Sequence, residues 1–281
     1  MALTADEVAH FQEHGWVEKR GALPVARIDA LRGRLSARIA GVASEYLAGE
    51  RREFDFWRLM ARSRYGLECF WRPGEGEAAL AAGREAPEWE PLVMRVGHGL
   101  HLVDDLFGAL CRDATVAGSL AQLTAPPVKV IQSAVVYKQP RDQLVQFGSH
   151  QDAWYLTTEP ESLVLAFVTL DDADLDNGCL EVLPGSHRAA LARRMTMTDR
   201  GFVQTAEGPP ADRRLETHPT TPLPTERGTI LFVHGRTFHA SRPNGSERPR
   251  RALIVHAMSA ASRFSSDCWI QEPPGGFEVV A

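Results

Sequence analysis

The second half of the sequence is a series of short apolar segments separated by turn residues, and this pattern restricts the possible folds more than any other feature. The segments occupy residues 128–137, 162–170, 179–183, 228–233 and 252–255. The run 162–170 has strand length and is apolar, as expected for a buried sheet element. Asn177-Gly178 and Asn244-Gly245 are strong turn pairs. The pattern predicts a β-sandwich or barrel.

The first part of the sequence has helical signals instead. Thr4 and Glu7 fit a capping box at the start of a helix that Gly15 ends. Apolar residues at positions 28, 31, 35, 39 and 42 follow Pro24 at helical spacing, which predicts a second, longer helix. We therefore interpret residues 1–281 as a single domain. It has a helical N-terminal part over about 1–125 and a β core over about 126–262.

Two stretches have no clear periodicity. Residues from about 49 to 90 are rich in Arg, Glu, Gly and Trp, and both a lid over the core and a plain surface loop fit them. Residues from about 188 to 225 carry many Arg, Thr and Pro, and we interpret them as a long surface insertion near the mouth of the barrel. The regions around Trp57 to Trp71 and from Arg188 to Thr225 are expected to line the substrate entrance.

Charge and cysteine usage exclude several classes of partner. The 31 basic and 36 acidic residues give a formal net charge of -5, which provides no basic surface for nucleic acid or an anionic membrane. No apolar run is long enough for a membrane span, and the N-terminus lacks the pattern of a secretory signal. The four cysteines are scattered without a Cys-x-x-Cys pair, which predicts reduced thiols and a cytoplasmic location.

The candidate metal ligands are His150, Asp152 and His239. Alternate side chains of an extended strand share a face, so His150 and Asp152 are predicted to project together. A His-x-Asp pair is weak evidence alone, but His239 follows another predicted strand, and strand ends can converge at the mouth of a barrel. Two imidazoles and one carboxylate suit Fe(II) and leave the opposite coordination positions open.

Ser241 and Arg250 lie shortly after His239. A strand through Ser241 that turns and returns through Arg250 would place the guanidinium beside the metal strand, where it could hold the far carboxylate of a dicarboxylate. The alternatives are a turn hydroxyl for Ser241 and a solvated charge for Arg250.

The other histidines and the aromatic pair after Asp152 receive weaker interpretations. His98 and His101 fit either the core or the pocket. Four more are interpreted as structural residues rather than ligands, namely His187, His218, His234 and His256. Trp154 and Tyr155 either face the site or pack on it.

Several of these stretches, taken together, resemble a known family over nearly the entire chain. They are Gln132-Ser133, Lys138-Gln139-Pro140, His150-Gln151-Asp152, Thr158-Glu159-Pro160, Asn177-Gly178-Cys179-Leu180, Leu183-Pro184-Gly185-Ser186-His187 and the segment from Arg236 to Arg250. Gly97-His98-Gly99-Leu100-His101 and the first helix also fit. The sequence resembles the phytanoyl-CoA dioxygenase family of Fe(II)/2-oxoglutarate oxygenases, and most of all its short branch of domain-containing proteins.

The resemblance implies a fold, a cofactor set and a reaction. The fold is mainly β with flanking helices around a double-stranded β-helix, the cupin-like jelly roll. Fe(II) is held by His150, Asp152 and His239, and 2-oxoglutarate binds the metal with its distal carboxylate on Arg250 and Ser241. Oxygen is the second cosubstrate, and an unactivated C–H bond of a small-molecule substrate becomes hydroxylated. Related halogenases lack the carboxylate that Asp152 supplies, which favours hydroxylation here.

The chain differs from the family pattern around the expected cosubstrate pocket. Arg95 stands where relatives often have a lysine that contacts the cosubstrate. Val168 stands where relatives commonly have tryptophan, and Ala134 where they have methionine, so both changes remove bulk and widen the predicted pocket. Gln132 is expected to share a strand face with Ala134 and is the candidate polar pocket group.

Two other classes of function compete with the oxygenase. One is a non-catalytic jelly roll that binds a ligand or metal as a sensor. The other is a zinc hydrolase, which neither a His-Glu-x-x-His motif nor a repeated His-x-His cluster supports. The substrate stays open between a coenzyme A thioester, for which Arg188, Arg193 and Arg194 could form a basic groove, a secondary metabolite and a small polar acid. The sequence indicates no oligomeric state.

Overall fold

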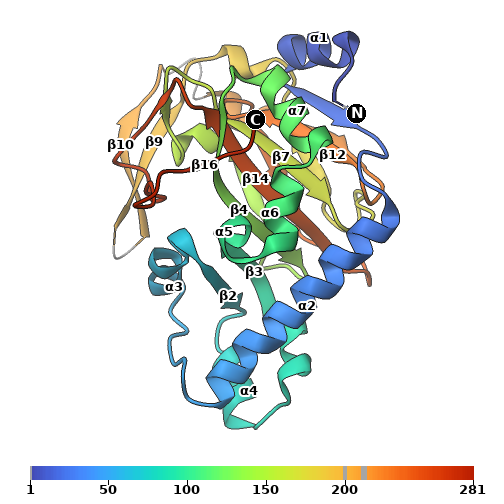
Figure 1. The fold of residues 1–281 in the computed structure, drawn as a ribbon, viewed down its shortest axis with the longest axis vertical. Coiled ribbons are helices and arrows are strands. Elements are labelled where there is room, and N and C mark those ends of the chain that lie inside the picture. The colour runs from blue at the N-terminus through green and yellow to red at the C-terminus, as the bar shows by residue number, and fades with distance from the viewer. Residues whose placement is uncertain (1, 199–200, 210–213) are drawn as a thin grey trace.

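The computed structural model describes residues 2–198, 201–209 and 214–281 and shows a mainly β protein with flanking helices (Figure 1). The predicted fold class is therefore confirmed. Its centre is a large antiparallel sheet in the order β1-β12-β7-β14-β4-β3-β2, with β16 also paired to β4. These strands are β1 (Trp16–Lys19), β2 (Leu67–Trp71), β3 (Val93–His98), β4 (Val128–Lys138), β7 (Val164–Thr169), β12 (Ile230–His234), β14 (Arg250–Ser259) and β16 (Glu278–Val279).

A smaller antiparallel sheet in the order β11-β8-β13-β5 faces the large one. Its strands are β5 (Phe147–His150), β8 (Leu180–Val182), β11 (Thr221–Leu223) and β13 (His239–Ser241). Leu165 and Phe167 of β7 pack in one apolar cluster with Leu180 and Val182 of β8. The two sheets therefore form the sandwich expected of a jelly roll.

Helices cover the other face of the large sheet. The helices α1 (Ala5–His14) and α2 (Val25–Leu47) occur where the sequence predicts them, and the Thr4–Glu7 capping box and the Gly15 end are both present. In Figure 1, α2 runs along one side of the molecule, and α6 (Asp105–Cys111) and α7 (Ala114–Leu123) lie over the sheet. Side chains of α2, including Ile28 and Leu35, share the main core with Val135 and Val255 of the sheet.

The N-terminal part is less purely helical than the sequence suggests, because β1, β2 and β3 all join the large sheet. Pairing also extends beyond residue 262, where β16 adds to β4. The single-domain organisation and its boundaries stay predictions.

The short helix α5 (Leu100–Val103) lies beside α6. The four cysteines are buried free thiols.

The two stretches without clear periodicity do contain regular structure. Residues 49–90 include α3 (Phe56–Arg62), η1 (Ser63–Tyr65), β2, α4 (Glu75–Ala81) and the start of η2 (Ala86–Leu92). In the second stretch, η4 (Ser186–Arg188) is followed by the hairpin of β9 (Arg193–Thr198) and β10 (Gly201–Glu207), by η5 (Arg214–Thr217) and by β11. Residues 199–200 and 210–213 of the predicted insertion lie outside the described residues. Two short strands, β6 (Thr158–Glu159) and β15 (Arg263–Phe264), pair with each other.

Within the described ranges, no helix combines the length and the apolar character that crossing a membrane requires.

Candidate metal centre

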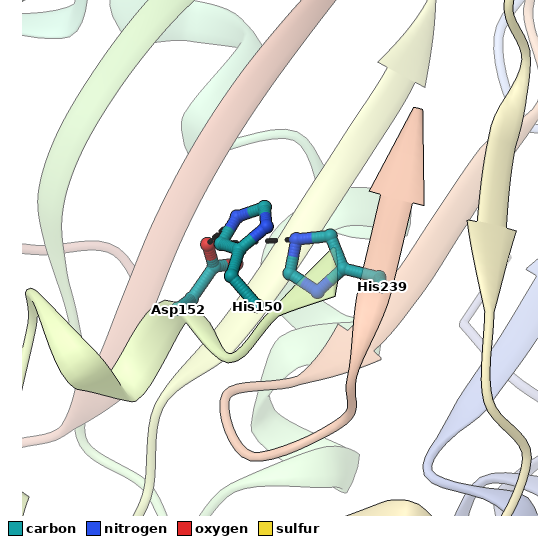
Figure 2. Close-up of side chains that lie close together, drawn as sticks. All are labelled: His150, Asp152 and His239. Carbon is teal, nitrogen blue, oxygen red and sulfur yellow. Dashed lines mark ion pairs between the residues drawn. The ribbon is translucent and has the colours of Figure 1, made fainter. Parts of the chain in front are cut away.

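The structure brings the three predicted metal ligands together (Figure 2). His150 and His239 lie opposite each other on the paired strands β5 and β13, with ring centroids 4.3 Å apart. Oδ1 of Asp152 is 3.6 Å from Nε2 of each histidine. The expectation that Asp152 continues a strand is wrong, because β5 ends at His150 and Asp152 opens the 3-10 helix η3 (Asp152–Trp154). The turn still directs the carboxylate toward both imidazoles.

Backbone contacts fix which nitrogen of each imidazole faces the shared point. Nδ1 of His150 is 2.8 Å from the carbonyl oxygen of Gly148, and Nδ1 of His239 is 3.0 Å from that of Thr237. A carbonyl only accepts, so both Nδ1 atoms donate and both Nε2 atoms keep a lone pair for a metal.

The electrostatics of the site also suit a metal. Burial lowers the pKa of His239 to about 4, so the imidazole is neutral at pH 7. Burial alone would raise the pKa of Asp152, but His239 and His256 together bring that pKa well below its usual value. The site therefore offers the neutral imidazole of His239 and the carboxylate of Asp152 in the protonation states that metal binding needs.

A hydrogen-bonded chain holds the other oxygen of Asp152. Nε2 of His256, on β14, lies 2.9 Å from Oδ2 of Asp152, and Nε2 of Gln132, on β4, lies 2.7 Å from Nδ1 of His256. The sequence interpretation of His256 as a structural residue missed this contact. Strand periodicity could have indicated that His256 faces the site, because alternate side chains of a strand share a face and this places His256 with Arg250.

Arg250 is almost fully buried, at 1% exposure, yet it reaches the metal end of the sandwich. Its Nη2 donates to the carbonyl of Gly178 at 2.9 Å and to Oγ of Ser241 at 3.0 Å, and its guanidinium lies over the ring of Phe167. The predicted hairpin geometry is wrong, because β13 and β14 belong to different sheets. Arg250 meets Ser241 across the sandwich instead.

A second buried cation, Lys138 at the end of β4, lies beside Arg250. Its Nζ donates to Oγ of Ser241 and to the carbonyl of Arg242. Burial and the neighbouring Arg250 lower the pKa of Lys138 to about 6, and burial lowers that of Arg250 to about 10. Neither cation has a carboxylate partner among the described residues, and Nε of Arg250 has no hydrogen-bond partner there. The unpaired Arg250 guanidinium favours an anion between the sheets, and such an anion would in turn favour the charged form of Lys138.

One cavity of about 500 Å³ connects these groups. The metal ligands, Ser241 and Arg250 line it, together with the predicted residues Arg95, Gln132, Trp154 and Tyr155. Nη1 of Arg95 lies 3.1 Å from Nε2 of His98, and the guanidinium is 5.7 Å from the ring centroid of Phe147.

The structure places Val168 and Ala134 away from the cavity lining. Leu165 and Phe167 of β7 face the cavity, so Val168 points into the main core on the helix-covered side. Ala134 shares a strand face with Gln132 and Val136, but its methyl group is fully buried against Gly97 of β3. The smaller side chain at position 168 therefore does not widen this cavity.

Aromatic side chains close the far side of the cavity, and two of them, Trp57 and Phe202, come from the stretches expected to line the substrate entrance. Trp57 of α3 lies 5.8 Å from Phe202 of β10, and Phe202 lies 4.8 Å from Tyr155, measured between ring centroids. We call these three residues the outer wall. Figure 1 shows α3 and the β9–β10 hairpin on the same side of the molecule. Arg193 of β9 lies over Trp154 and pairs with Glu216, so it is not free to form a basic groove.

The fold and the site together define a jelly-roll protein with a centre of two histidines and one carboxylate. The profile of the family described as Phytanoyl-CoA dioxygenase (PhyH) matches residues 11–252. Phytanoyl-CoA dioxygenase domain-containing protein 1 of Bos taurus is 29% identical over 290 residues, covering 97% of this chain and 96% of that protein. The Mus musculus protein of the same name is 35% identical over 193 residues, covering 66% and 64%.

Solved structures show the same fold. The epimerase SnoN in complex with Fe3+, alpha ketoglutarate and nogalamycin RO has a TM-score of 0.63 at 21% identity, covering 96% of this chain and 90% of that one. The chain belongs to the phytanoyl-CoA dioxygenase (PhyH) family. It is accordingly an oxidoreductase of the dioxygenase class.

Proposed function

We propose that this protein is an Fe(II)- and 2-oxoglutarate-dependent dioxygenase. In the proposed reaction it hydroxylates an unactivated C–H bond of a small organic substrate while 2-oxoglutarate is converted to succinate and CO2. One observation carries the proposal, namely a single cavity that joins the three-ligand centre to the buried Arg250, which has no carboxylate partner among the described residues.

The donor set fits iron. Two imidazole nitrogens and one carboxylate oxygen on one side of a metal are the ligands that non-haem Fe(II) oxygenases use, and they leave coordination positions for other ligands. A structural zinc site would instead be closed by four protein ligands. The group found among the described residues contains three.

The same cavity fits 2-oxoglutarate. Arg250 and Ser241 would hold its distal carboxylate, and the partnerless Nε of Arg250 would gain an acceptor from that anion. Lys138 would add a second positive charge to this end of the cavity. SnoN binds iron and the same keto acid on a similar fold, which supports the assignment.

Iron and 2-oxoglutarate, when bound, supply the oxidising power for inserting an oxygen atom from O2 into a C–H bond. The protein's own residues bind and orient. His150, His239 and Asp152 would hold the metal and leave coordination positions for other ligands. The outer wall and Trp269 line the remaining space, exclude water and hold the target carbon near the metal. The substrate candidates Trp154 and Tyr155 contribute to the same lining.

The proposal can be tested with purified protein. Under anaerobic conditions, Fe(II) and 2-oxoglutarate together should raise the melting temperature more than either alone, and aerobic succinate release should follow addition of a substrate. Asp152→Ala should lose metal binding and succinate formation, whereas Asp267→Ala, a change at an exposed carboxylate, should keep both. Iron binding without any effect of 2-oxoglutarate would favour the sensor alternative, and stoichiometric zinc after reconstitution with both metals would favour a hydrolase.

A further inference from the structure

One side chain in the cavity is left with an unused hydrogen-bonding atom. Gln132, on β4, lines the cavity and is only 5% exposed. Its Nε2 faces Nδ1 of His256 at 2.7 Å, whereas its carbonyl oxygen Oε1 is buried and has no hydrogen-bond partner. A buried acceptor without a partner costs stability, so its presence at a binding cavity calls for an explanation.

The hydrogen-bonded chain to the metal ligand fixes the orientation of this amide. The carboxylate of Asp152 accepts a hydrogen bond, so Nε2 of His256 donates to it. When the ring proton is on Nε2, Nδ1 of His256 accepts, and the NH2 group of Gln132 that faces it in the structure donates. Turning the amide over would bring its oxygen against a ring nitrogen that also accepts. The carbonyl of Gln132 is therefore held away from His256.

The rest of the cavity indicates what kind of molecule meets that carbonyl. Much of the wall is aromatic and comes from Phe56, Trp57, Phe147, Trp154, Tyr155, Phe167, Phe202 and Trp269. Among the described residues of this lining, Asp152 supplies the one carboxylate, and as a candidate metal ligand it is not available to an ammonium group. A cationic substrate would thus lose its hydration without gaining a counter-ion.

We propose that Oε1 of Gln132 is a substrate-binding acceptor and that the substrate is a ring-containing, largely apolar molecule without an ammonium group that presents a hydroxyl or N–H group to it. The inference rests on the proposed function, because it places the substrate beside the metal centre. A site that needs a donor discriminates strongly against an analogue without one, since the acceptor is then left buried and unpaired.

Binding of four probes to the wild-type protein tests this directly. The probes are naphthalene, 2-naphthol, 2-methoxynaphthalene and 2-naphthoate, titrated by calorimetry into the metal-free protein and, separately, into protein with Mn²⁺ and 2-oxoglutarate added. We expect 2-naphthol to bind about fivefold to tenfold more tightly than naphthalene, as one net hydrogen bond predicts. 2-Methoxynaphthalene has no donor and should resemble naphthalene. Equal affinities, a preference for the methoxy compound, or tighter binding of 2-naphthoate would overturn the proposal.

A matched pair of variants assigns the preference to one residue. Gln132→Met keeps the length of the side chain but removes the carbonyl, so the advantage of 2-naphthol over naphthalene should disappear. Gln146→Met makes the same change at an exposed lining residue and should preserve the advantage. A hydroxyl preference that survives in Gln132→Met would contradict the assignment. If Gln132→Met does not fold, the comparison of probe affinities on the wild-type protein still tests the proposal.

The same titrations separate this inference from the proposed function. Probe affinity needs no turnover, and Gln132 and His256 are in place without added metal. If the hydroxyl preference depends on Gln132 but 2-oxoglutarate neither binds nor yields succinate, the acceptor stands and the dioxygenase assignment fails. If succinate forms normally but the probes show no preference, the acceptor assignment fails and the dioxygenase stands.

Discussion

The two ends of the cavity are held together by different interactions. At the metal end, polar side chains are held by hydrogen bonds. The outer wall consists instead of aromatic side chains that are held by contacts between their rings. Asp152 and Arg250 each have assigned polar partners, and Arg250 is almost fully buried. Trp57 and Phe202 come from a short helix and a hairpin that meet through their rings. The chemistry is thus built on the rigid sandwich, and substrate selection on segments added to it.

This comparison predicts that changes at the metal end alter cofactor binding, whereas changes at the outer wall alter only substrate binding. The largest effect outside the ligands is expected for Arg250→Met. Loss of the buried charge should raise the dissociation constant of 2-oxoglutarate at least about 30-fold and leave Mn²⁺ affinity unchanged. Calorimetry measures both. Arg248→Met, which alters an exposed arginine paired with Asp174, is the control, and an equal loss there would remove the special role of Arg250.

The next largest effect is expected for His256, a positioning residue that acts through Asp152. His256→Phe should weaken Mn²⁺ binding about tenfold to a hundredfold, because the metal-binding carboxylate loses its hydrogen bond. His256→Gln offers an N–H donor and should recover part of the affinity, as followed by the EPR signal of free Mn²⁺. His101→Phe changes another buried histidine, one that contacts Ser133 outside the cavity lining. Comparable weakening in that variant would point to a general loss of structure.

A smaller effect is expected at the outer wall. Phe202→Ala removes ring contacts with both Trp57 and Tyr155, so the affinity for 2-naphthol should fall roughly threefold to tenfold. Affinities for Mn²⁺ and 2-oxoglutarate should stay as in the wild type. Val203→Ala, at the adjacent exposed position, should have no effect. Weakened metal binding in Phe202→Ala would show that the two ends of the cavity are not independent.

The smallest effect concerns the pH dependence of stability at the metal end. The pKa of Lys138 is lowered to about 6 by burial and by Arg250, so the unfolded chain binds more protons at this lysine between pH 6 and 10.5. The free energy of unfolding of the metal-free protein should therefore rise with pH, by at most about 1.4 kcal/mol per unit from this group.

Urea unfolding between about pH 7 and pH 8 measures that slope, because this window lies between the pKa values of histidines and of thiols in the unfolded chain. Lys138→Met should flatten it, whereas Lys129→Met, a change at a lysine paired with Glu272, should not. Adding 2-oxoglutarate to the wild type should also flatten the slope, because a nearby anion favours the charged lysine. An unchanged slope in Lys138→Met would show that this lysine is not the origin.

The sequence by itself determined the local elements and pointed to the three candidate metal ligands that the structure brings together. Helical periodicity and caps located α1 and α2, and the apolar segments located β4, β7, β12 and β14. These signals are readable because they depend on neighbours a few residues apart. The pair His150 and Asp152 was also readable, although a turn rather than a continuous strand brings the two side chains together.

Only the tertiary structure decided which residues oppose one another across the sandwich. A strand's period of two shows that Arg250 and His256 share a face, but not that this face meets Ser241 and Asp152 of other segments. The same limit misplaced Val168, whose side of β7 is set by the helices packed on that sheet. Contacts such as Trp57 with Phe202 join residues far apart in the chain, and the packing of whole elements, rather than any local preference, fixes them.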